Sequence, residues 1–384
     1  MEIIYALEQI PYKLTKSIFL AGPIPRDKET KSWRPDAIQI LQDIGFENGT
    51  IFNPETRNGK WHGDHEKQIE WEENALNLAD IILFWIPRNL KTLHGLSTNI
   101  EWGRWENSGK VVVGWPEDAE RMNYIGHYAK KFNIEPKSTL TETIEEALAK
   151  LGDGVVRTNG DRYINLFLWK LPSFQNWFDD LKNSGNRLES CETILYLPTP
   201  KNPSAAIWII RPNVFLPKED RYKKNEIVIG RPDLSSVCMY KDTGDDIEIV
   251  LVKEFRSSVS NDDGMVWELP SGGFLAEQTH SHQENACNEV KEETGFDLDD
   301  KKLQFGGARQ MASTMMSFKS HLFSYRLDQE ELEWFKSQKG IAKGIKKEGE
   351  RCFVEVVRLN DIKAKNLVDW SVLGQILSVV RYDD

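Results

Sequence analysis

The chain has 384 residues, of which 28% are charged and 40% are hydrophobic, and its formal net charge is −11. This length exceeds the roughly 250–300 residues beyond which a single core usually divides, so we expect at least two domains. A nucleic-acid partner would require a basic surface that displaces counterions from the phosphate backbone. The acidic composition therefore excludes nucleic acid as the expected partner and leaves small molecules as the expected ligands.

The expected compartment is the cytoplasm. Four cysteines are scattered along the chain without a CxxC pair, which indicates free thiols in a reducing environment. The N-terminal residues MEIIYALEQIPYK lack the apolar core and the small-residue cleavage site of a signal peptide. No stretch approaches the roughly 20 apolar residues of a membrane span, so no membrane partner is expected either.

Residues 1–155 alternate short apolar runs with helical patterns. Apolar runs fall at residues 17–23, 50–55, 79–87 and 110–116, and helices are predicted at residues 66–78 and 98–107. A further helix is predicted to start at a Ser32 cap, to hold Pro35 in its first turn and to end at Gly45. Strands that are apolar on both faces indicate a doubly wound parallel sheet of the Rossmann or flavodoxin-like class. Ligands of such sheets bind at the carboxyl ends of strands, which makes Gly22 and Pro23 candidate substrate-binding residues.

Three segments of this part, FLAGP, WEENALNLADIILFWIP and GLSTNIEWGRWENSGKVVVGWP, lie within roughly residues 17–130. Together they resemble the nucleoside 2-deoxyribosyltransferase family and its nucleotide N-glycosidase relatives. The resemblance implies that Glu101 is a nucleophile that attacks the anomeric carbon of the sugar. It also implies that Glu72 is the second carboxylate, where the family has Asp, and that Asn123 contacts substrate across a subunit interface. A homo-oligomer is therefore expected. Gly95 stands where the family has another Asp.

Both carboxylates have alternative interpretations. Thr98-x-x-Glu101 matches a capping box, in which Glu101 would only satisfy backbone donors at a helix start. Glu72 has three acidic neighbours in the same predicted helix and could belong to its solvated face.

A helical connector is expected at residues 156–194. It contains the segment PSFQNWFDDLKN, whose aromatic residues Phe174, Trp177 and Phe178 would pack between domains or in a dimer interface. Residues 198–206, PTPKNPSAA, have the composition of a linker or turn.

A second group of carboxylates lies in residues 268–296, ELPSGGFLAEQTHSHQENACNEVKEETGF. A helix over residues 283–294 would place Glu289 and Glu293 one turn apart with Glu292 beside them, and Gly295 would end it. Like charges at this spacing destabilise a helix unless a cation offsets them. Oxygen ligands without a thiolate pair are suited to Mg²⁺ or Mn²⁺.

This segment, with EFR and WELPSGG before it, resembles the Nudix hydrolases of the ADP-ribose pyrophosphatase type. The resemblance implies an α/β/α Nudix domain with a mixed sheet over residues 195–384. It implies metal binding by Glu289, Glu293 and Gly272, catalysis by Glu292 and by a loop carboxylate at Glu350 or Glu348, and substrate binding by Arg256. The chain departs from the family in three ways: Asn288 replaces an Arg, the loop after Gly273 is one residue longer, and Thr279 and His280 replace Gly-Glu.

The two resemblances predict a bifunctional enzyme that acts on a nucleotide or nucleoside. One domain would cleave or transfer an N-glycosidic bond, and the other would hydrolyse a nucleoside diphosphate-linked substrate with Mg²⁺. The alternative function is that of a sensor, in which a degenerate Nudix domain binds an ADP-ribose-like ligand and regulates the first domain. A third interpretation of the acidic helix is a solvated surface without chemistry.

Overall fold

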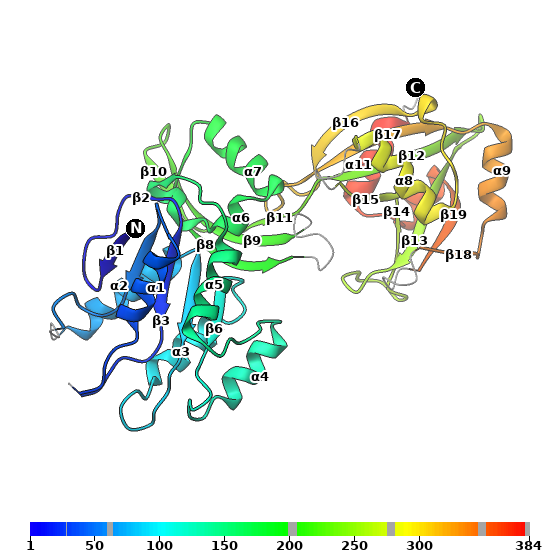
Figure 1. The fold of residues 1–384 in the computed structure, drawn as a ribbon. Coiled ribbons are helices and arrows are strands. Elements are labelled where there is room, and N and C mark those ends of the chain that lie inside the picture. The colour runs from blue at the N-terminus through cyan, green and yellow to red at the C-terminus, as the bar shows by residue number, and fades with distance from the viewer. Residues whose placement is uncertain (28, 60–63, 199–205, 275–280, 345–350, 381–384) are drawn as a thin grey trace. The chain divides into compact units, whose positions relative to one another are not determined.

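A computed structural model describes residues 1–27, 29–59, 64–198, 206–274, 281–344 and 351–380. The chain divides into two compact units, the first comprising Met1–Leu197 and Trp208–Ile227, the second Pro198–Ile207 and Val228–Asp384 (Figure 1). The residues up to Leu197 and those of Trp208–Ile227 thus belong to the first unit, whereas the sequence analysis groups residues 195–384 in one domain. Among the described residues, no helix is long and apolar enough to span a membrane.

A five-stranded parallel sheet forms the centre of the first unit, in the order β1-β4-β3-β5-β6. Its strands are β1 Glu2–Tyr5, β3 Ser17–Ala21, β4 Thr50–Asn53, β5 Ile81–Trp85 and β6 Val111–Gly114. The chain leaves β3 for β4 on one side and later continues with β5 on the other side. Their carboxyl ends therefore form the switch point at which doubly wound sheets bind ligands.

Helices cover both faces of this sheet, as the apolar runs predict. One core contains buried residues of α2 His65–Leu78, α3 Leu96–Trp105 and α4 Asn123–Lys131. The other contains buried residues of α1 Arg34–Asp43 and α5 Leu140–Leu151. The flavodoxin-like class predicted for this part is confirmed.

Two predicted helix starts are wrong. The N-cap of α1 is Trp33, not Ser32, although the Ser32 hydroxyl accepts from the backbone N–H of Arg34, the first residue of the helix, and donates to Glu55. Helix α3 begins two residues before Thr98, and its N-cap is Gly95 in the left-handed conformation. Pro35 does lie in the first turn of α1.

The rest of the first unit consists of elements outside the parallel sheet, all of which except β2 follow it in the chain. They are β2 Lys13–Leu14 paired with β7 Arg157–Thr158, η1 Asn159–Tyr163, α6 Leu166–Trp169, α7 Pro172–Asn183, β8 Arg187–Leu197, β9 Ile207–Leu216 and β10 Arg221–Lys223. Helix α7 coincides with the predicted aromatic segment. Its Phe174 and Phe178 are buried and lie near the rings of Trp177 and Trp208, so this helix packs on β9.

An eight-stranded mixed sheet forms the second unit, with the path β16-β17-β12-β13-β19-β18, β14 paired to β13 and β15 paired to β12. Its strands are β12 Leu234–Asp242, β13 Ile247–Phe255, β14 Met265–Glu268, β15 Ser271–Gly273, β16 Gln304–Gln310, β17 Lys319–Arg326, β18 Ala342–Lys343 and β19 Cys352–Arg358; β11 Val228–Gly230 precedes them. The pair β12 and β17 is parallel and the others are antiparallel. The predicted mixed sheet is therefore confirmed.

Helices lie on both faces of this sheet as well. Buried residues of α8 His282–Thr294 and α9 Gln329–Ser337 share a core with one face. Those of α10 Leu359–Lys365 and α11 Trp370–Val379 share a core with the other face, and η3 Asp300–Lys302 is a short turn. Helix α8 starts with a capping box of Ser281 and Glu284 and stops at Gly295, which adopts the left-handed conformation expected of a helix-terminating glycine.

Candidate active sites

Arg34 organises the carboxyl end of β3. Its side chain is fully buried, and its guanidinium donates to the carbonyl oxygens of Leu20 at 3.1 Å, Gly22 at 2.8 Å and Pro23 at 3.3 Å. At Gly22, a Cβ atom would lie 2.2 Å from the carbonyl oxygen of Trp85 at the end of β5. Only glycine allows β3 and β5 to approach this closely, so the backbone of Gly22 and Pro23 is fixed at the switch point. Substrate binding by these two residues stays a prediction.

Three carboxylates balance the buried charge of Arg34. Glu55, just after β4, forms an ion pair with it at 3.1 Å between Nη1 and Oε1. Burial lowers the pKa of Arg34, whereas the charges of Glu55, Glu101 and Glu72 raise it. The guanidinium is thus a fixed positive charge among these carboxylates, at the end of the sheet where ligands of this fold bind.

Glu101 lies in the second turn of α3 and is partly buried. Burial and then the charge of Glu72 raise the pKa of its carboxyl group to about 7, against the opposing charge of Arg34. A carboxyl group that titrates near neutral pH beside a second carboxylate is typical of a catalytic site. The sequence motif thus lies at the position where the fold would place its substrate.

Glu72 lies on α2 and is held by a neighbouring amide. Gln68 is buried, and its Nε2 donates to Oε1 of Glu72 at 2.6 Å and to the carbonyl oxygen of Pro54 at 2.9 Å. Burial raises the pKa of Glu72, against the hydrogen bond from Gln68 and the charge of Arg34. The solvated face of α2 consists of other glutamates, because Glu66, Glu70 and Glu73 are exposed and Glu72 is not.

The capping-box interpretation of Glu101 is wrong. Thr98 lies inside α3 rather than at its N-cap, and its buried hydroxyl has no hydrogen-bond partner among the described residues. Gly95 takes the N-cap position with φ of 65°, and a Cβ there would meet Cβ of Pro23 at 3.3 Å. An Asp at this position would be strained, so the glycine is explained by the local backbone.

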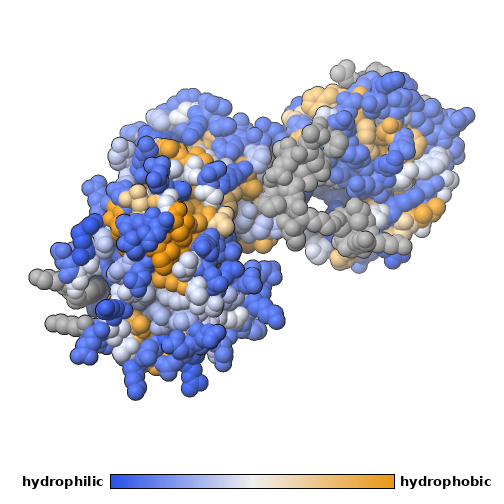
Figure 2. All heavy atoms as spheres, in the orientation of Figure 1, coloured by the Kyte–Doolittle hydropathy of each residue, from blue (hydrophilic) through white to orange (hydrophobic). Residues whose placement is uncertain are grey.

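Asn123 is exposed at the first residue of α4. Large apolar side chains are also exposed on α3 and α4, at Leu96 (67%), Ile100 (76%) and Tyr124 (83%). On the face of the first unit drawn in Figure 2, hydrophobic areas lie among hydrophilic ones. A contact of Asn123 across a subunit interface stays a prediction.

The second site is built where β15 meets α8. At Gly272 a Cβ atom would lie 2.0 Å from Cδ of Glu289, so strand and carboxylate are in direct contact. Glu293, one turn further along α8, accepts a hydrogen bond from the backbone N–H of Ser271 at 3.1 Å. Burial raises the pKa of Glu293 well above its usual range, and Glu289, Glu268 and Glu254 raise it further. The predicted proximity of Glu289 and Glu293 is therefore observed.

Two further carboxylates complete this cluster. Glu254 on β13 and Glu268 on β14 form ion pairs with Arg256, at 2.9 and 3.1 Å. All three residues line a cavity of about 490 Å³ together with Glu289, Glu292 and Glu293. The sequence motifs EFR and WELPSGG contain Arg256 and Glu268, but their convergence depends on the antiparallel pairing of β13 with β14.

The chemistry of this donor set fits a hard divalent cation. Carboxylates from α8, β13 and β14 line one cavity, where burial and then the neighbouring carboxylates raise the pKa of Glu293, and oxygen ligands of this kind suit a hard cation. Glu292 lines the same cavity from an exposed position on α8. Glu350 and Glu348, like Thr279 and His280, lie outside the described residues.

The fold and the first site define an α/β protein with a pair of glutamates at the switch point of a flavodoxin-like sheet. Residues 15–119 match the family described as "Nucleoside 2-deoxyribosyltransferase like". The chain therefore carries a domain of this kind, which spans β3 to β6 and includes Glu72 and Glu101. No curated protein matches the chain. The family match covers no part of the second unit.

Proposed function

We propose that the first unit cleaves or transfers the N-glycosidic bond of a nucleoside or nucleotide, with Glu101 as the nucleophile. The observation that carries this proposal is the position of Glu101 beside Glu72 at the switch point, within a segment that matches the deoxyribosyltransferase-like family. Gly22 and Pro23 would form the floor of the substrate site. The exposed apolar residues of α3 and α4 support a homo-oligomer in which Asn123 reaches a neighbouring site.

In the proposed reaction, a carboxylate oxygen of Glu101 bonds to the anomeric carbon while the bond from that carbon to the base nitrogen breaks. The departing base takes the electron pair and a proton, which Glu72 would donate because its raised pKa favours the protonated form. Water or an acceptor base then attacks the sugar ester and releases Glu101. The positive charge of Arg34 stabilises the ionised form of Glu101 that the first step needs.

The test is base release from a set of nucleosides and nucleoside monophosphates, measured by chromatography on the full chain. Glu101→Gln should abolish release, and mass spectrometry should find a sugar adduct on Glu101 in the unmodified protein. Glu70→Gln is the matched control, since Glu70 is an exposed glutamate on α2. Base release by Glu101→Gln at the rate of the control would refute the assignment.

We propose further that the second unit is a Nudix pyrophosphohydrolase that acts on a nucleoside diphosphate-linked substrate of the ADP-ribose type. The supporting observation is the convergence of five glutamates and Arg256 on one cavity beside β15. Glu289, Glu293 and the backbone of Gly272 would hold Mg²⁺ or Mn²⁺. A bound cation of this kind polarises a pyrophosphate toward attack by water. Glu292 would assist catalysis, and Arg256 would bind the anionic substrate. Neither family match nor fold class establishes this activity, so it rests on the motif and the cavity.

Turnover of ADP-ribose by the full chain with Mg²⁺ tests this part, with release of ribose phosphate as the measurement. Glu289→Gln and Glu293→Gln should each remove it, because a neutral amide is a poor ligand for Mg²⁺. Glu330→Gln, on the exposed side of α9, is the control.

A sensor is the second candidate function for this unit, because Asn288 replaces the family's Arg. Binding of ADP-ribose without turnover, together with a changed rate of base release, would favour the sensor over the hydrolase. If both activities are present, the monophosphate from the second unit is a chemically suitable substrate for the first.

A further inference from the structure

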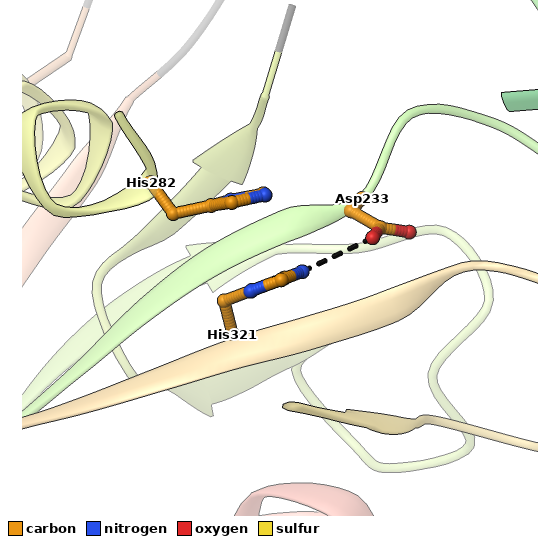
Figure 3. A group of neighbouring side chains, drawn as sticks. All are labelled: Asp233, His282 and His321. Carbon is orange, nitrogen blue, oxygen red and sulfur yellow. Dashed lines mark hydrogen bonds and ion pairs between the residues drawn. The ribbon is translucent and has the colours of Figure 1, made fainter. Parts of the chain in front are cut away.

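A cluster of two histidines and an aspartate lies in the second unit, formed by side chains other than the glutamates of the acidic cavity. One ligand atom each of Asp233, His282 and His321 lies within 4.8 Å of the others. Asp233 directly precedes β12, His282 is the first residue of α8, and His321 lies on β17. Figure 3 shows both imidazole rings extending toward the side of the cluster where Asp233 lies, with one nitrogen of His321 joined to Asp233 by the dashed line. We propose that these three residues bind a divalent transition-metal cation of the Zn²⁺ type.

Hydrogen bonds already orient the aspartate. Its Oδ1 accepts from the backbone N–H of Lys319 at 2.8 Å, and its Oδ2 lies 3.1 Å from Nε2 of His321. One carboxylate oxygen is thus held by the backbone, while the other faces an imidazole. In metal sites, a carboxylate that binds the ion through one oxygen is usually oriented by a hydrogen bond to its other oxygen.

The histidines are oriented in the same way. Nδ1 of His282 lies 3.1 Å from the hydroxyl oxygen of Ser235, so Nε2 is the candidate ligand atom that this ring offers within the described part of the chain. The two imidazoles stack with their centroids 3.5 Å apart and their planes 9° apart, and Phe274 lies 4.0 Å from the other side of His282. In the metal-free protein, this stacking holds both imidazoles close together. To direct the lone pairs of both rings at one ion, the two rings must tilt apart.

The donor set selects the kind of cation. Imidazole nitrogen is a good ligand for Zn²⁺ and related transition metals and a poor one for Mg²⁺, which the glutamate cavity would take. Three protein ligands leave the fourth position of a tetrahedral site open for water. The cation would tie together the segment before β12, the first turn of α8 and β17. Its main effect should therefore be on the stability of this unit.

A structural role without metal is the competing explanation, because the pair of Asp233 with His321 and the contact of His282 with Ser235 each satisfy polar groups. This explanation predicts that Zn²⁺ does not bind at these three residues. The metal proposal instead predicts saturable binding that depends on all three.

The test uses the full chain after removal of metal with a chelator. Calorimetric titration with Zn²⁺ should show one site that is lost in His282→Gln, His321→Asn and Asp233→Asn. We expect each variant to weaken binding by more than about 100-fold, since loss of an outer partner alone costs roughly 10–100-fold. His127→Gln, on exposed α4, is the control and should bind as the unmodified protein does. Bound Co²⁺ should also give the visible absorption of a tetrahedral nitrogen and oxygen site.

Thermal unfolding of the metal-free proteins shows whether a variant has lost Zn²⁺ binding only because it no longer folds. Asp233→Asn keeps an acceptor for Lys319, so this variant should unfold near the temperature of the unmodified metal-free protein but gain nothing from Zn²⁺. Equal Zn²⁺ stabilisation of Asp233→Asn and the control would overturn the proposal. If the unmodified protein binds no Zn²⁺ at about 10 μM cation, the Kd is weaker than about 10 μM and the proposal is overturned as well.

Discussion

At the scale of single residues, the protonation of Glu101 should decide the pH dependence of base release. A nucleophilic carboxyl group must be ionised, and burial with Glu72 nearby holds the pKa of Glu101 at about 7. We therefore expect the rate to rise as the pH increases through about 7. In the residual activity of Glu72→Gln, this rise of the rate with pH should occur at lower pH, because Glu72 raises the pKa of Glu101. A rate that falls over the same range would identify Glu101 as a proton donor instead of the nucleophile.

The same pKa also predicts an effect on stability. The carboxyl group of Glu101 titrates near 7 in the folded protein and near its ordinary value of 4.5 in the unfolded chain. Between these values the folded state binds more protons, so this group destabilises the protein as the pH rises through the window. Glu101→Gln should raise the free energy of unfolding by roughly 1–2 kcal/mol at pH 8, after a discount for partial exposure, and by little at pH 4.5. Denaturant unfolding at both pH values checks this, and equal effects would contradict it.

At the scale of elements, the contact of β15 with α8 should be sensitive to a single methyl group. In Gly272→Ala the new Cβ would lie 2.0 Å from Cδ of Glu289, so the strand or the carboxylate must move. We expect Mg²⁺-dependent release of ribose phosphate from ADP-ribose to be lost and stability to fall by about 1–3 kcal/mol, the usual range for overpacking. Gly374→Ala is the control, because a Cβ at this position of α11 meets no atom of the described residues within 4 Å. Activity of Gly272→Ala equal to that of the control would argue against a metal ligand at Glu289.

At the scale of the whole molecule, the two proposed activities should be chemically separable. A carboxylate that attacks carbon needs no cation, whereas pyrophosphate cleavage does. A chelator should therefore stop release of ribose phosphate from ADP-ribose and leave base release from a nucleoside monophosphate unchanged. Both activities are measured on the same sample by chromatography. If base release from a monophosphate also stops, the second unit regulates the first and the sensor hypothesis gains support.

Much of the fold could be predicted from local sequence patterns. Buried parallel strands are apolar along their whole length, so β3, β5 and β6 were predictable as elements of a doubly wound sheet. Helix α8 was predictable from a glutamate-rich helical pattern with a glycine stop at Gly295. Helix starts were less predictable, because Ser32 and Thr98 are good capping residues whose hydroxyls have other surroundings in the folded chain.

The sequence by itself predicted the chemistry that we propose for both candidate sites, since Glu101, Glu289 and Glu293 lie in motifs whose spacing is local. Only the tertiary structure decided which groups surround them. Arg34, Glu55 and Gln68 reach the first site from separate elements, and Glu254 reaches the second site through the pairing of β13 with β14. The physical reason is that the pKa of a carboxyl group depends on burial and on charges close in space, and strand order sets those distances. Asp233, His282 and His321 are likewise up to 88 residues apart along the chain and meet only in the folded sheet.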